Sequence, residues 1–255
     1  MQAQGKSKPT PYRGTLTPKS ASEGIHIAKT NATRLLDDAE TLFKNGRYPS
    51  ACALTVLAIE ELSKPAIIRK IVIAESPQEI ARAWKLFSSH LDKGAPWILP
   101  QLIKGTATYE DFVEEFMRNR NPILLDSLKQ ISIYCGCYGK SHWSSPSEVI
   151  EKDQAELLIA TARILNLSGQ PSPLDSEEGI RLWKSHMKGC FSVGYVTANN
   201  KIVEFFAKAA DHGLLPENRI PESAAFDFMT TVLVLSDGEV EEQKRMFGIP
   251  FTGDT

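Results

Sequence analysis

The longest run of apolar positions lies between Ala51 and Ile59, where Thr55 is the only polar residue. A helix that is apolar on every side must be buried, so this stretch predicts the central helix of a bundle. Glu60, Glu61 and Lys64 follow directly. Spacings of three and four residues put the lysine within reach of either carboxylate on one face of the helix. The charged triplet is therefore either a paired internal network that acts as a brace or the floor of a site.

Apolar residues also recur at steps of three and four on both sides of this segment, which predicts further amphipathic helices. Pro65 should kink the central helix or end its first half. No stretch alternates with a period of two, so we expect no strand and an all-α fold. The aromatic and glycine-rich segment 132–146 is expected to be an irregular loop. The predicted helices cover approximately residues 18–45, 51–74, 77–91, 109–134, 147–167, 177–188, 199–212 and 222–235.

Composition divides the chain into three parts. Residues 1–19 contain four basic residues and no acidic residue, which is typical of a flexible N-terminal arm. The two prolines between Gln170 and Leu174 mark a linker. We therefore expect a helical domain over 20–169 and a C-terminal helical extension over 170–255. No hydrophobic signal core or bilayer-length apolar run is found, so the expected location is cytoplasmic, without membrane contact.

Charge and cysteine content limit the kinds of binding site and catalytic site that the sequence supports. A formal net charge of −2 gives no global attraction to nucleic acid, although a local patch could still bind it. Cys135 and Cys137 are too close and too isolated for a zinc knuckle, even with His142 nearby. We expect reduced structural thiols, no metal and no cofactor. A glycine-rich phosphate loop, a zinc-binding His-Glu-x-x-His helix and a Gly-x-Ser-x-Gly elbow are also missing, which argues against the enzyme classes built on them.

Several short motifs, in this order, carry a resemblance to a known family: Asn31-Ala32 with Leu35-Leu36 and Ala39, Gly46-Arg47-Tyr48 with Ala51, Glu60-Glu61-Leu62-Ser63-Lys64, and His90 with Lys93. In this order they resemble the AbiV family of abortive phage infection proteins, a branch of the HEPN superfamily. The resemblance covers Ser20 to Leu167, and Ser63 stands where the family usually has glycine. It implies an HEPN-like helical bundle and a homodimer, and the apolar periodicity adds further C-terminal helices outside the resemblance.

The resemblance also implies an abortive-infection function that blocks phage propagation, with RNA cleavage or inhibition of translation as routes. Many HEPN proteins are metal-independent ribonucleases with an Arg-x4 to x6-His motif, in which histidine moves a proton and arginine holds the phosphate. Arg181 and His186 have this spacing, but Leu182 replaces the usual polar residue and the pair lies outside the resemblance. Whether the protein is an enzyme stays open.

The family pattern implies a different site, built from Glu61, Lys64, His90 and Lys93. A carboxylate there would orient the histidine, whereas the structural alternative is a buried network that fixes helix register. A second functional hypothesis is a non-catalytic interaction module that binds a phage or host protein. RNA is the other expected partner. For RNA, the sequence offers a small stacking platform formed by Trp143 with Tyr134, Tyr138, Lys140 and His142.

Overall fold

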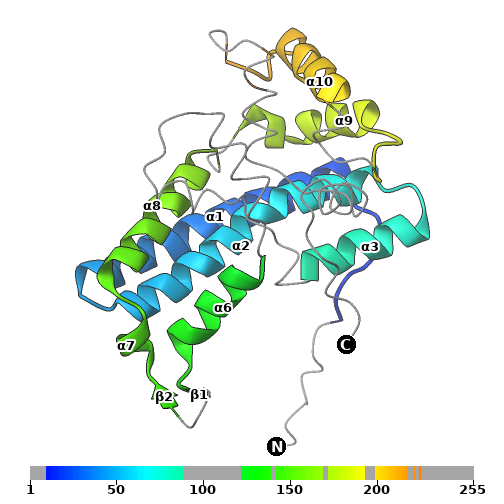
Figure 1. Ribbon diagram of the computed structural model, residues 1–255. Coiled ribbons are helices and arrows are strands. Elements are labelled where there is room, and N and C mark those ends of the chain that lie inside the picture. The colour runs from blue at the N-terminus through cyan, green and yellow to red at the C-terminus, as the bar shows by residue number, and fades with distance from the viewer. Residues whose placement is uncertain are drawn as a thin grey trace, which may run out of the picture.

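The computed structural model describes residues 10–88, 122–138, 142–168, 172–192 and 199–216, with residues 221 and 224. These residues are mainly helical, as the sequence predicts, and Figure 1 shows two long helices at the centre of the arrangement. The elements are α1 (Pro18–Lys44), α2 (Tyr48–Ile73), α3 (Pro77–Ser88), α6 (Pro122–Ile133), β1 (Gly136–Tyr138), β2 (His142–Ser144), α7 (Pro146–Val149), α8 (Lys152–Ser168), the 3-10 helix η1 (Pro173–Asp175), α9 (Glu177–His186) and α10 (Asn199–Asp211).

The limits of α1 follow from its end residues. The Thr17 hydroxyl accepts a hydrogen bond from the Ser20 amide at 3.1 Å, and Pro18 occupies the first helical position. Gly46 lies just beyond the other end with φ of 70°, a left-handed conformation that glycine adopts without steric cost. Both predicted ends of this helix are confirmed. The short connection turns the chain back, so that α2 packs along α1.

The central helix is longer than its apolar run. It begins at Tyr48 rather than at Ala51 and continues to Ile73, with Pro65 inside it. Of the two effects expected of Pro65, an end to the first half of the helix is therefore wrong, and a kink stays a prediction. Apolar residues are buried along both halves of α2, as predicted for the central helix of a bundle. Packing on several sides holds the proline within the helix, where its missing N–H removes a single backbone hydrogen bond.

Two larger apolar clusters share α2. The first joins its N-terminal half to α1 and α8, with α6 packed at its edge. The second joins its C-terminal half to α3, α9 and α10. A smaller cluster places Ile180 of α9 against α1 and α2. The helices beyond the predicted linker thus cover the second half of α2. The largest fully buried side chains in the second cluster are Trp183, Phe191, Phe205, Phe206, Ile67, Ile71, Met187 and Ile202.

Two local predictions need correction. Segment 132–146 is not wholly irregular, because β1 and β2 pair as an antiparallel hairpin with Cys137 opposite Trp143. Each strand has three residues, too few for a period of two to stand out in the sequence. The single helix expected over 147–167 is divided into α7 and α8 by Ile150 and Glu151. Of the helix predicted over 109–134, the part from Pro122 is confirmed. Residues 109–121 and nearly all of 222–235 lie outside the described residues.

Candidate functional site

Glu61 and Lys64 form a partly buried ion pair on α2. The Lys64 Nζ lies 2.5 Å from Glu61 Oε1, and each side chain is 18% exposed. The same ammonium lies 5.3 Å from the ring centroid of Phe87, in the last turn of α3. A cation at this distance from an aromatic face is attracted by the ring. The pair is thus held between two helices while keeping access to solvent.

Glu60 does not share this pair. Its Oε1 accepts a hydrogen bond from Lys129 Nζ of α6 at 2.7 Å, and the two side chains are only 6% and 9% exposed. Successive residues on a helix point about 100° apart, so the neighbouring acids face different surroundings. The predicted triplet is therefore split into a buried cross-helix pair and a more accessible pair between Glu61 and Lys64.

His90 and Lys93, the other members of the site implied by the family pattern, lie outside the described residues. The described part of this candidate site is therefore the Glu61–Lys64 pair and its contact with Phe87. Phe87 precedes His90 by three positions in the sequence. The contact brings the last turn of α3 next to the ammonium of Lys64.

Arg181 and His186 both lie on α9. The Arg181 guanidinium is bound to Glu177 Oε1 at 2.6 Å on an exposed face. His186 is half-buried, with its Nδ1 3.5 Å from the Ser185 hydroxyl. Five positions along a helix correspond to a rotation of about 140°, so the two side chains point in different directions. Arg181 and His186 of one helix therefore do not face the same phosphate, and either residue would need a partner group from another part of the structure to act on it.

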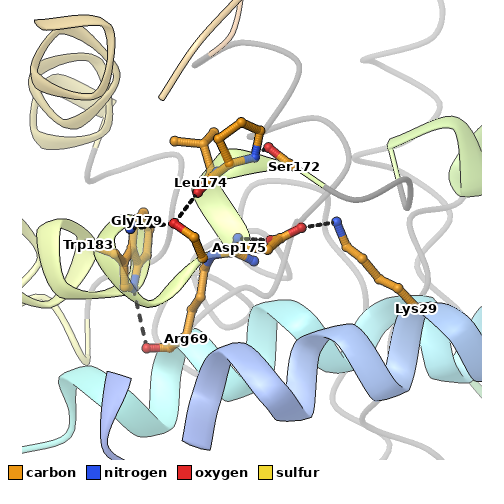
Figure 2. A network of polar contacts seen from close by, with 9 residues as sticks. Lys29, Arg69, Ser172, Leu174, Asp175, Gly179 and Trp183 are labelled. Carbon is orange, nitrogen blue, oxygen red and sulfur yellow. Dashed lines mark hydrogen bonds and ion pairs between the residues drawn. The ribbon is translucent and has the colours of Figure 1, made fainter. Parts of the chain in front are cut away.

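A buried charged cluster that the sequence analysis missed connects three elements. Asp175 of η1 accepts a hydrogen bond from Lys29 of α1 on Oδ2 and another from Arg69 of α2 on Oδ1, each at 2.5 Å. The side chains are 11%, 11% and 7% exposed. Figure 2 shows the carboxylate between the two cations, with the Trp183 indole donating to the Arg69 carbonyl at 3.3 Å. The cluster fastens η1 to both central helices.

The electrostatics of this cluster favour an ionised carboxylate. Burial by itself raises the pKa of Asp175, but the charges and hydrogen bonds of Arg69 and Lys29 outweigh it and hold that pKa below its usual range. Burial lowers the pKa of Lys29, and Asp175 offsets only part of this effect. A carboxylate engaged on both oxygens by buried cations is suited to holding elements together rather than to exchanging protons.

The sequence contains a signal for two members of this cluster. Lys29 occurs among the inward-facing positions of α1, and Arg69 lies within the apolar second half of α2. A charged residue at an inner helical position requires a partner. The partner could not be identified from the sequence, because Asp175 lies 106 residues after Arg69.

The described structure gives little support for metal sites, reactive thiols or membrane-spanning helices. The described ranges contain no group of three or more His, Cys, Asp and Glu residues placed to hold a metal ion. All four cysteines are free thiols; Cys52 and Cys190 are buried, whereas Cys135 and Cys137 are exposed. Burial raises the pKa of the Cys52 thiol. Among the described helices, none combines the length and apolar character needed to cross a membrane.

Comparison with known proteins identifies the family. No curated protein and no solved structure matches the chain. The family profile described as AbiV, of the HEPN type, matches residues 20–166, which is more than half of the chain. The match includes α2, the hairpin and nearly all of α1 and α8, and it stops before the 3-10 helix that carries Asp175. The chain therefore belongs to the AbiV family, and this membership implies a role in abortive-infection defence.

Proposed function

We propose that this protein blocks phage propagation through a working site that contains Glu61 and Lys64 and is completed by His90 and Lys93. The observation that carries the proposal is the state of the Glu61–Lys64 pair, inside the matched range and on the most buried helix. Its side chains are 18% exposed, whereas those of the neighbouring Glu60–Lys129 pair are 6% and 9% exposed. The Glu60–Lys129 pair is as buried as a purely structural ion pair, whereas the Glu61–Lys64 pair remains accessible to another molecule.

The route that uses these residues most fully is cleavage of RNA. A histidine that titrates near neutral pH can take the proton of a ribose 2′-hydroxyl, and the 2′-oxygen then attacks the adjacent phosphorus. The bond to the 5′-oxygen breaks, and that oxygen receives the proton that the histidine took up. The Lys64 ammonium would stabilise charge that develops on the phosphate, while Glu61 holds the ammonium in place. His90 is the histidine that the family pattern assigns to this position.

A non-catalytic function is the second candidate, and a specific observation favours it. The Lys64 ammonium already has a carboxylate at 2.5 Å and an aromatic ring at 5.3 Å. A cation with both contacts has less to gain from a phosphate. In that case the same partly exposed surface would bind a phage or host protein, and protection would not require RNA cleavage.

The first test is phage plating on cells that express wild type, Glu61→Gln, Lys64→Met or His90→Ala, with the melting temperature of each purified variant. Methionine at position 64 keeps an apolar side chain against Phe87 while removing the charge. Arg34→Met is the matched control, because Arg34 also forms an ion pair within one helix, with Asp38, but on an exposed face. We expect the three site variants to lose protection with little change in melting temperature, and the control to keep it.

Protection that falls only in step with melting temperature would identify the Glu61–Lys64 pair as a brace and contradict the proposed site. Cleavage of RNA in the presence of EDTA then separates the two routes. Purified wild type should cleave RNA under chelation, and Lys64→Met and His90→Ala should not. A wild type that protects cells but leaves RNA intact would instead favour the interaction module. The His186→Ala variant tests whether α9 contributes to either activity.

A further inference from the structure

Large apolar side chains are exposed at the β1–β2 hairpin and at the end of α6 that leads into it. The Trp143 side chain is 77% exposed, Tyr134 is 61% exposed and Ile133 is 48% exposed. In contrast, Trp84 and Trp183 are 9% and 0% exposed. The described part of the chain contains only two other exposed large hydrophobic residues, Tyr12 and Ile27. Exposed large apolar residues on neighbouring elements are typical of an interaction surface.

The hairpin presents Trp143 without cover. Cys137 lies directly opposite Trp143 in the antiparallel register, so these two side chains share one face of the hairpin. Cys137 is also exposed, and therefore the cross-strand neighbour does not bury the indole. Figure 1 shows the hairpin at the lower edge of the molecule, beyond the ends of α6 and α7. The indole is thus available to a partner from solvent.

The charge of this segment suits an anionic partner. The sequence contains no acidic residue between Asp126 and Glu148, although the whole chain has 31. Within that interval Lys129 is already paired with Glu60, and the sequence also supplies Lys140 and His142. The carboxylate next to the hairpin in the described structure, that of Glu148, accepts a hydrogen bond from the Ser145 amide at 3.1 Å. A strand of nucleic acid that approached the hairpin would therefore meet less repulsion than most of this mildly acidic protein would impose.

We propose that the β1–β2 hairpin is a stacking surface for single-stranded RNA, with Trp143 as its main contact and Tyr134 as a second ring. Every base has a π-face, so stacking on an exposed indole binds a single strand without requiring a particular sequence. The small size of the hairpin argues against a protein partner, because stable protein interfaces bury about 800 Å² on each side. The proposal rests on the proposed function only for its choice of RNA over single-stranded DNA.

The test is the affinity of the purified full-length protein for a short fluorescein-labelled oligouridine, measured by fluorescence anisotropy at low salt. Trp143→Ala should weaken binding by at least about fivefold, since stacking on one aromatic ring contributes roughly 1–3 kcal/mol. Trp143→Phe should keep most of the affinity because a ring remains. Ile27→Ala is the matched control, with a side chain 67% exposed on α1 and no π-face, and should bind as wild type does. Melting temperatures should be unchanged in all three variants.

Equal binding by wild type and Trp143→Ala would overturn the proposal, and so would a wild type that does not bind oligouridine. If Trp143→Ala loses phage protection while oligouridine binding stays the same, the hairpin contacts a protein and the RNA surface is refuted. The Lys64→Met variant tests whether RNA binding by the hairpin is separate from the proposed working site. Loss of protection in that variant with unchanged oligouridine binding supports two separate surfaces. If neither Lys64→Met nor His90→Ala affects protection, the working site fails while the hairpin result stands by itself.

Discussion

Removing the carboxylate of Asp175 should strongly destabilise the protein. The structure places this group between Lys29 and Arg69, and all three side chains are at most 11% exposed. In Asp175→Ala the two cations would face each other in a buried space without their shared counter-charge. Breaking a buried ion pair by removing one partner costs about 3–5 kcal/mol. A free-energy loss of 1 kcal/mol lowers the melting temperature of a chain of this size by about 2–4 °C, which gives a decrease of about 6–20 °C.

The assay is urea and thermal unfolding followed by far-ultraviolet circular dichroism. Glu177→Ala is the matched control, because it removes a carboxylate from an ion pair with Arg181 whose side chains are 46% and 66% exposed. Exposed pairs contribute at most about 1 kcal/mol, so the control should unfold close to wild type. Equal destabilisation of Asp175→Ala and Glu177→Ala would refute the argument that burial gives the Asp175 cluster its importance.

A second substitution tests the cause of the loss. If loss of the shared counter-charge destabilises Asp175→Ala, then removing one of the two cations should recover part of the stability. Lys29→Met keeps an apolar stem of similar length in the α1 position and removes the charge. The double variant Lys29→Met/Asp175→Ala should therefore be more stable than Asp175→Ala. A double variant that is less stable, by the sum of both single losses, would mean that packing rather than charge is responsible.

Three further outcomes follow from the same structure. The pKa of Asp175 is depressed from 3.8. The stability advantage of wild type over Asp175→Asn should therefore be complete above about pH 3.8 and disappear as pH falls through the depressed pKa. Urea unfolding at several acidic pH values measures this advantage. Glu60→Ala should cost about 3–5 kcal/mol in unfolding free energy, because it leaves Lys129 buried without this counter-charge. Gly46→Ala should lower the unfolding free energy by about 1–2 kcal/mol, because φ of residue 46 is 70°. Gly24→Ala within α1 should be neutral or stabilising. Thermal unfolding of both variants makes the comparison.

The helix ends were predictable because local groups determine them. Thr17 and Ser76 each accept a hydrogen bond from an amide three residues later, and Gly46 adopts the left-handed conformation that ends α1. These interactions involve neighbours in the sequence, so the residue pattern contains the information. The buried course of α2 was predictable for a related reason, since its apolar run leaves no side that could face water.

Features that depend on distant neighbours were not predictable to the same degree. The hairpin strands are too short to show alternation, and pairing across the turn forms them. The division between α7 and α8 has no glycine or proline at Ile150 and Glu151 to announce it. The Asp175 cluster joins residues separated by 146 and 106 positions, and no local rule selects such partners.

The two adjacent acids of α2 show why a charged site cannot be read from one helix. Sequence spacing makes Glu60 and Glu61 equal candidates for Lys64, because both three-residue and four-residue separations lie on one helical face. The structure resolves the choice through Lys129, which arrives from α6, 69 residues after Glu60. A lysine that is 9% exposed requires a counter-charge, and the helix rotation of about 100° per residue turns Glu60 toward it. Glu61 is thereby left to Lys64. Neighbouring acids of the same type thus have separable roles: substitution of Glu60 should act through stability, and substitution of Glu61 through protection against phage.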